Sequence, residues 1–119
     1  LEGLFNNIPG AKACSLVLHP APGAMGGSMR DHVVECMANC MAELGLSTLR
    51  FNFRGTGKSE GVSSTAGPQS AWGTTEGLDV MAAVTFLRER VASDAKVVLC
   101  AYSMGTGVGL GHVVVDDTF

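Results

Sequence analysis

Ser103 lies in a residue pattern that is typical of a catalytic nucleophile. The segment from Ala101 to Gly105 reads Ala-Tyr-Ser-Met-Gly, and it follows an apolar run. It matches Gly-x-Ser-x-Gly with alanine in place of the first glycine, a pattern in which the serine occupies a strained turn between a strand and a helix. Both outer positions must be small because the turn brings them into close contact. A hydroxyl presented in this way can attack the carbonyl carbon of an ester-like bond.

Such an attack leaves negative charge on the carbonyl oxygen, and hydrogen-bond donors must hold that charge. The backbone N–H of Met104 suits this role because it lies where the serine turn enters a helix, at the positive end of the helix dipole. The simpler interpretation is that Ser103 only caps a helix that follows a strand. We favour the nucleophile because two further informative loops are expected at the same place.

Strands and helices alternate along the rest of the chain. Apolar runs such as residues 13–18 are typical of strands buried on both faces of a parallel sheet. We predict strands over residues 1–5, 13–18, 48–53 and 96–100, and helices over residues 28–45, over residues 75–91 and after Ser103. This order implies an α/β fold, with a parallel sheet of three or four strands and flanking helices on both faces.

Three loops then meet at the carboxyl edge of the predicted sheet. They comprise residues 19–27, 54–61 and 103–105, each of which directly follows a predicted strand. In open parallel sheets this edge forms the binding site. The topology therefore predicts a site around Ser103 without reference to any family.

The same loops carry motifs of a known superfamily. The segments are His19–Pro22 with Gly26–Met29, then Arg50–Gly61, then Ala101–Gly105. Together they resemble the α/β-hydrolases, in particular the small lidless ones, with dienelactone-hydrolase-like and serine-aminopeptidase-like enzymes as broader relatives. Three motifs in the same order are more specific than any one of them, and the resemblance covers nearly the whole chain.

The resemblance implies roles for individual residues. Ser103 becomes the nucleophile and the Met104 N–H becomes one oxyanion donor. The second donor is expected in the loop after residues 13–18, where the two prolines have no N–H. Ala21 is the first choice for this donor and Gly23 the second.

Other residues near the loops are expected to line the site or to support it. His19, Gly23 and Tyr102 are predicted to line it, and for His19 a turn-stabilising hydrogen bond is favoured over a role as catalytic base. Trp72 is a candidate for the pocket wall, although a single aromatic residue near a loop more often serves packing. Arg54 resembles part of a structural turn beside the site.

The superfamily order of nucleophile, acid and then histidine is not completed in this sequence. The later histidine, His112, is expected in the helix behind the nucleophile, where it would point away from the serine hydroxyl, and Asp116 and Asp117 lie beyond it. We therefore expect residues 1–119 to form a partial domain that lacks the first strand and the C-terminal strands. Residues 1–5 would correspond to the second strand, and the open sheet edge could self-associate.

Composition excludes several classes of protein. The chain has 119 residues, 46% of them hydrophobic, and a formal charge of −3. It has no basic run for nucleic acid and no apolar stretch long enough to span a membrane. Its four cysteines lack the dense spacing of a secreted disulfide framework, so we predict free thiols and a cytoplasmic location.

Glycine-rich stretches do not indicate a nucleotide cofactor. The segment Gly55–Ser59 is similar to part of a phosphate loop, but Asn52 stands where that loop requires glycine, and no helix follows directly. The alternating glycines of residues 105–111 are out of register with the dinucleotide fingerprint.

A metal site is also not expected. His32, Cys36 and Cys40 share one face of a predicted helix, but they lack a fourth ligand for zinc. Small thiols commonly face a core, which is the interpretation we favour.

The sequence thus predicts a serine hydrolase that acts on a small-molecule ester or thioester through an acyl intermediate on Ser103. The 119-residue chain alone is expected to be inactive because no acid or histidine of a triad can be assigned. The alternative is a non-catalytic, hydrolase-like binding or interaction module.

Overall fold

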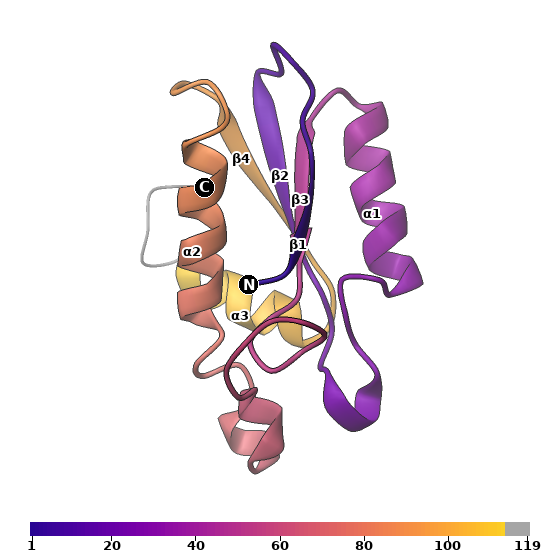
Figure 1. Cartoon of the computed structure of the whole chain (residues 1–119), viewed down its shortest axis with the longest axis vertical. Coiled ribbons are helices and arrows are strands. Elements are labelled where there is room, and N and C mark those ends of the chain that lie inside the picture. Colours follow the sequence, from indigo (N-terminus) through magenta and orange to yellow (C-terminus); the bar gives the residue numbers. More distant parts are fainter. Residues whose placement is uncertain (114–119) are drawn as a thin grey trace.

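A computed structural model describes residues 1–113 of the chain. Four strands form one sheet and three α-helices pack around it (Figure 1). The strands are β1 (Gly3–Asn6), β2 (Ala13–Leu18), β3 (Ser47–Phe51) and β4 (Lys96–Ala101). The helices are α1 (His32–Glu43), α2 (Gly77–Arg88) and α3 (Met104–Val113), with short 3-10 turns at Gly23–Met25, Ser64–Ala66 and Gln69–Ala71.

The strand order in the sheet is β1-β3-β2-β4. Strand β2 pairs in parallel with both neighbours, so that Leu16 lies opposite Leu49 on one side and Leu99 on the other. The predicted α/β fold with a parallel sheet is confirmed for these three strands. Strand β1 instead runs antiparallel to β3, because residues 7–12 are too few for the crossover that a parallel arrangement with β2 would need.

The helices cover both faces of the sheet (Figure 1). On one face, α2 and α3 bury the side chains of alternate strand residues such as Leu16 and Leu18. On the other face, Val17 of β2 packs against Val34 and Ala38 of α1. The strands are apolar on both faces because each face has its own helical cover.

Helix α1 begins at His32, four residues after the predicted start at residue 28. The Asp31 carboxylate accepts a hydrogen bond from the Val33 N–H at 2.9 Å, so Asp31 is the N-cap. Ser28 accepts from the Arg30 N–H and begins the turn that precedes the helix. Both residue types favour N-caps, and the one that lies next to the first helical residue takes the role.

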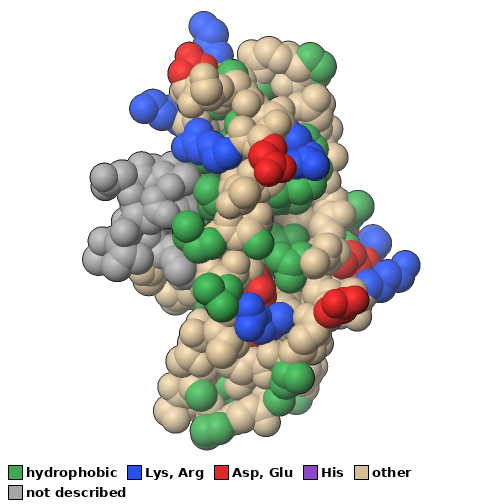
Figure 2. Space-filling model, turned by 60° about the vertical axis from the view of Figure 1, so that its left-hand side comes forward, with side chains coloured by type: hydrophobic (Ala, Val, Ile, Leu, Met, Phe, Trp, Pro, Cys, Tyr) green, Lys and Arg blue, Asp and Glu red, His purple; other side chains and the backbone are tan. Residues whose placement is uncertain are grey.

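Within residues 1–113, none of the helices has both the length and the apolar character needed to span a bilayer. On the face drawn in Figure 2, basic and acidic side chains are interspersed, and hydrophobic side chains gather between them.

Candidate functional site

Ser103 occupies a sharp turn between β4 and α3. Strand β4 ends at Ala101 and the helix begins at Met104. Ser103 is exposed, and its φ of 53° makes it the one non-glycine residue with positive φ among residues 1–113. A left-handed backbone at such a residue costs about 1–3 kcal/mol and tends to occur at functional sites. The local geometry is therefore that of a strained strand-to-helix turn with its hydroxyl at the surface.

Neighbouring elements hold this turn in place. The Tyr102 N–H donates to the Leu18 carbonyl at 3.2 Å, which ties the turn to the end of β2. A Cβ atom at Gly105 would lie 2.7 Å from the His19 carbonyl oxygen and 2.9 Å from Leu18 Cβ. Position 105 must therefore be glycine, because α3 approaches the β2 backbone at that point.

Ser103 opens onto a cleft of about 630 Å³. The cleft wall also includes Ala21 and Met104, the two residues predicted to donate to an oxyanion. The remaining lining residues are uncharged: Met25, Gln69, Trp72, Gly73, Thr74, Gly107 and Val108. The site that these residues form suits an uncharged ligand with an apolar portion.

Two backbone donors at this cleft have no partner in the described part of the chain. Neither the Met104 N–H nor the Ala21 N–H donates a hydrogen bond within residues 1–113. The Ala21 carbonyl, by contrast, accepts from the Gly27 N–H at 2.9 Å, which fixes the loop after β2. Gly27 cannot carry a side chain, because a Cβ there would collide with the Pro20 and Ala21 carbonyl oxygens.

The other three residues predicted to line the site are not on the cleft wall. Gly23 borders a different hollow, formed with Gly55 and Val62 among others. Tyr102 is 43% exposed but lies outside the cleft lining. His19 is completely buried, close to Gly105 beneath the serine turn.

His19 serves as a structural link between two loops. Its Nε2 accepts a hydrogen bond from the Phe53 N–H at 3.0 Å, and its Nδ1 lies 2.6 Å from the Pro20 carbonyl oxygen. The ring is therefore neutral, with the proton on Nδ1 donated to Pro20. Burial lowers the pKa of His19, although the hydrogen bond to Pro20 opposes the shift. The favoured expectation for this residue, a turn-stabilising hydrogen bond, agrees with this geometry.

Arg54 ties the loop after β3 to α2. Its guanidinium donates to both carboxylate oxygens of Asp79, with Nη2 at 2.9 Å from Oδ1, and its backbone N–H donates to Oδ2 at 2.8 Å. The hydrogen bond to Asp79 raises the pKa of Arg54. A bidentate pair of this kind fixes orientation as well as distance.

Glu76 is a positioning residue that the sequence analysis missed. It is completely buried, and its carboxylate accepts from the Ser64 N–H at 2.8 Å and the Ser64 hydroxyl at 2.7 Å. Ser63 and Thr75 donate further hydrogen bonds to it. Burial acts to raise the pKa of Glu76, but the hydrogen bonds from Ser64 and its neighbours outweigh it, so the pKa lies below the ordinary value of 4.5. The Ser64 hydroxyl also accepts from the Gly73 N–H, so Glu76 holds the loop that forms one cleft wall.

The glycine-rich loop after β3 is occupied by a carboxylate of the chain itself. One Glu2 oxygen accepts from the Lys58 N–H and from the Asn52 side chain, both at 2.8 Å. A Cβ at Gly57 would collide with that same oxygen and with Asn52. These contacts give the loop a structural role.

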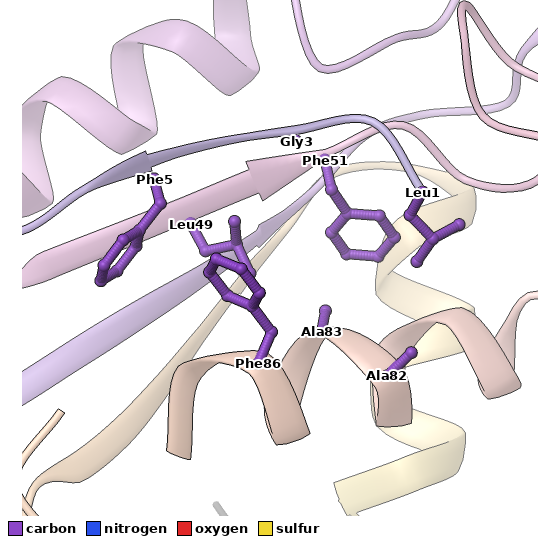
Figure 3. Close-up of a pocket in the computed structure, with 8 residues that line it drawn as sticks. All are labelled: Leu1, Gly3, Phe5, Leu49, Phe51, Ala82, Ala83 and Phe86. Carbon is purple, nitrogen blue, oxygen red and sulfur yellow. The ribbon is translucent and has the colours of Figure 1, made fainter. Parts of the chain in front are cut away.

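An apolar groove between the sheet and α2 is not a candidate for a catalytic site. It measures about 360 Å³ and lies between β1, β3 and α2 (Figure 3). Phe5 and Phe86 meet edge to face across it, with ring centroids 5.6 Å apart. Its lining consists of apolar side chains and Gly3, so it offers no nucleophile, acid or base.

Among the residues that the structure describes, the acid and histidine of a triad are not found at the cleft. The described lining of the cleft contains no histidine or carboxylate. His112 lies within α3, and Asp116 and Asp117 lie outside the described residues. The structure thus brings together Ser103, Met104 and Ala21, and none of the residues described here completes a triad with them.

Comparison with known proteins supports the resemblance seen in the sequence. No protein-family model matches the chain, and no curated protein matches it. Among solved structures, an α/β serine hydrolase homologue from Coxiella burnetii superposes with a TM-score of 0.81 at 28% identity, over 97% of this chain and 52% of that one. An α/β serine hydrolase without a lid from Xanthomonas campestris gives 0.75 at 28% identity, over 91% and 47%.

An esterase from Pyrococcus furiosus shares the fold at a TM-score of 0.75 and 23% identity, over 92% of this chain and 40% of that one. The chain therefore spans about half the length of the solved structures it matches. The chain has the fold of the α/β-hydrolases in these structures, and it resembles the N-terminal portion of a member of that superfamily.

Proposed function

We propose that this chain is the nucleophile-bearing portion of a serine hydrolase that acts on small-molecule esters or thioesters. The observation that carries the proposal is the positive φ of Ser103, on a strand-to-helix turn that opens onto an uncharged cleft. A serine that only capped a helix would have no need of a strained backbone. Its φ would lie in the extended region that N-cap residues normally adopt.

The proposed reaction has two steps. The Ser103 hydroxyl oxygen attacks the carbonyl carbon, and the leaving group departs with a proton to give an acyl-serine. Water then attacks the acyl group and releases the acid. In both steps, the N–H groups of Met104 and Ala21 would hold the negative oxygen, a role supported by their place on the cleft wall and their lack of partners within residues 1–113.

The proposed base that accepts the serine proton is not among the residues described. His19 is unsuited to the task, because its two ring nitrogens are engaged with Phe53 and Pro20 and it is completely buried. Hydrolytic activity is therefore proposed for the complete protein. The 119-residue chain alone is expected not to hydrolyse activated esters at an enzyme-like rate.

Labelling with a fluorophosphonate tests the proposal, because the probe phosphonylates a serine only where a competent base activates it. We expect the complete protein to be labelled at Ser103. The label should be lost in Ser103→Ala and retained in Ser70→Ala, an exposed serine outside the cleft lining. An unlabelled complete protein would favour the non-catalytic module. Rapid ester hydrolysis by the 119-residue chain, abolished in Ser103→Ala, would refute its predicted inactivity.

We further propose that the chain self-associates through the open edge at β4, where Val98 is 38% exposed. An unpaired edge strand with apolar side chains favours such pairing. Size-exclusion chromatography at increasing concentration should show growth in apparent mass, which Val98→Lys should reduce.

A cytoplasmic location remains part of the proposal, supported by four free thiols.

A further inference from the structure

The outer surface of α1 carries two thiols side by side. Cys36 and Cys40 are four residues apart on one helix, which places them one turn apart on the same face. Both are exposed and neither is in a disulfide, whereas Cys14 is buried and Cys100 is half-buried. The expectation that these two thiols face a core is therefore wrong. The buried residues of α1 that meet the sheet are Val34 and Ala38.

The neighbouring Cys36 thiol raises the pKa of Cys40. Both side chains are exposed and lie one turn apart on the same helix face, so a single reagent can reach both sulfurs.

The geometry of the pair argues against both a disulfide and a zinc site. Side chains four apart on a helix have Cβ atoms about 5–6 Å apart. A disulfide needs about 3.5–4.5 Å, so the helix would have to distort. Zinc needs four ligands, and within residues 1–113 no group of three or more His, Cys, Asp or Glu side chains is placed to hold a metal ion.

A soft, sulfur-binding atom that takes only two sulfur ligands from the protein needs neither the short disulfide distance nor four protein ligands. It places one additional atom between the sulfurs, which spans the wider Cβ separation, and it needs no further protein ligand. We propose that Cys36 and Cys40 form a dithiol binding site for trivalent organoarsenicals on the outer face of α1.

The reaction is a condensation without electron transfer. A trivalent arsenical such as phenylarsonous acid carries two hydroxyl groups on arsenic. Each As–O bond breaks as an As–S bond forms, and each thiol proton leaves with a hydroxide as water. Two water molecules are released, arsenic stays trivalent, and its phenyl group fills the third position.

Two-point attachment makes a quantitative difference. Once one sulfur is bound, the second reacts within the same molecule at a high effective concentration. Binding through both thiols should therefore be about 100-fold tighter than binding through one. It should also resist an excess of a monothiol such as glutathione and yield to a small-molecule dithiol.

The test uses the reduced 119-residue chain and phenylarsine oxide, which hydrates to phenylarsonous acid. Intact mass spectrometry should show one adduct, and thiol titration should show two thiols consumed. Peptide mapping should place the adduct on α1. Glutathione in excess should leave the adduct in place, and 2,3-dimercaptopropanol should remove it.

Variants separate a dithiol site from simple thiol reactivity. Cys36→Ser and Cys40→Ser should each weaken binding about 100-fold, whereas Cys100→Ala should not. Cys40→Ser combined with Glu43→Cys keeps two exposed thiols on the helix, but seven residues and about 10 Å apart along the axis, so it should bind weakly. Circular dichroism verifies that each variant folds. Equal affinity in Cys40→Ser, removal of the adduct by glutathione, or an adduct on Cys14 or Cys100 would overturn the proposal.

Discussion

Replacing Glu76 with glutamine tests whether one buried carboxylate holds the wall of the proposed active site. The side chain keeps its size, but one of its two oxygens becomes an NH2 group that cannot accept a hydrogen bond. Both oxygens are acceptors in the native structure: Oε1 receives the Ser64 N–H and the Ser63 hydroxyl, and Oε2 receives the Ser64 hydroxyl and two donors of Thr75. No orientation of the amide satisfies all of them.

The cost follows from those partners. The less damaging orientation places the NH2 at the Oε2 position, where hydroxyl donors can rotate but the Thr75 N–H cannot. Leaving that buried donor unpaired costs about 1 kcal/mol, the low end of the range because its native bond is long. Turning two charge-assisted bonds from Ser64 into neutral ones costs about 1 kcal/mol each. We therefore expect Glu76→Gln to lose about 3 kcal/mol.

The measurement is urea-induced unfolding of wild type and Glu76→Gln, followed by circular dichroism, with the exposed Glu60→Gln as control. For 119 residues, a loss of about 3 kcal/mol corresponds to about 12 °C in melting temperature. The difference should depend on pH. Because the folded pKa of Glu76 is below 4.5, its contribution is complete at neutral pH and is lost as the pH falls below that value.

Two results would refute this reasoning. If Glu76→Gln lost no more than Glu60→Gln at neutral pH, the carboxylate would contribute no net stability. If wild type and Glu76→Gln differed by the same unfolding free energy at neutral pH and well below pH 4.5, the effect would come from packing rather than from charge.

Three further predictions concern the serine turn and its supports. Because burial lowers the pKa of His19 below 6.5, the unfolded chain takes up a proton first as the pH falls, so stability measured by urea unfolding should decline below about pH 6.5, and equally so in the His32→Gln control. Gly105→Ala should lower the melting temperature through its clash with β2, by about 2 kcal/mol in unfolding free energy, whereas Gly111→Ala, whose added Cβ meets no described atom within 4 Å, should gain about 0.5–1 kcal/mol. Ser103→Gly should stabilise the fold by about 1 kcal/mol in the same assay, since glycine accepts a φ of 53° without strain.

Each of these has a clear contrary outcome. A stability that is flat between neutral pH and about pH 5 would contradict the buried neutral state of His19. Equal effects of alanine at positions 105 and 111 would deny the close approach of α3 to β2. Loss of stability in Ser103→Gly would indicate that the serine side chain supports the turn, as in an ordinary helix cap.

Local sequence patterns predicted the helices and strands whose position is set by their own residues. The nearly continuous apolar run of residues 13–18 forms β2 with the predicted ends. The direction of β1 could not be read in the same way, because it depends on the short link of residues 7–12 and on a partner strand more than forty residues away. The start of α1 was predicted at residue 28 but lies at His32, because Ser28 and Asp31 are both good N-cap residues and only the backbone decides between them.

The site shows the same division. The turn at Ser103 was predictable because its spacing of small residues is a local requirement of the backbone. The burial of Glu76 was not, since its partners Ser63 and Ser64 reach it only through the fold of a polar loop. Nothing about a glutamate before an apolar helix distinguishes a solvated first-turn residue from a buried loop anchor.

The supports of the serine turn explain how a strained residue persists in this fold. Each loop around the cleft is fixed by hydrogen bonds whose donors and acceptors are satisfied internally, through His19 after β2, the Arg54–Asp79 pair after β3 and Glu76 before α2. None of these groups lines the cleft. The polar features left facing Ser103 are therefore uncharged, including two backbone donors without partners in residues 1–113. Charged groups thus support the loops and uncharged groups line the cleft, an arrangement that agrees with the proposed binding of a neutral carbonyl compound.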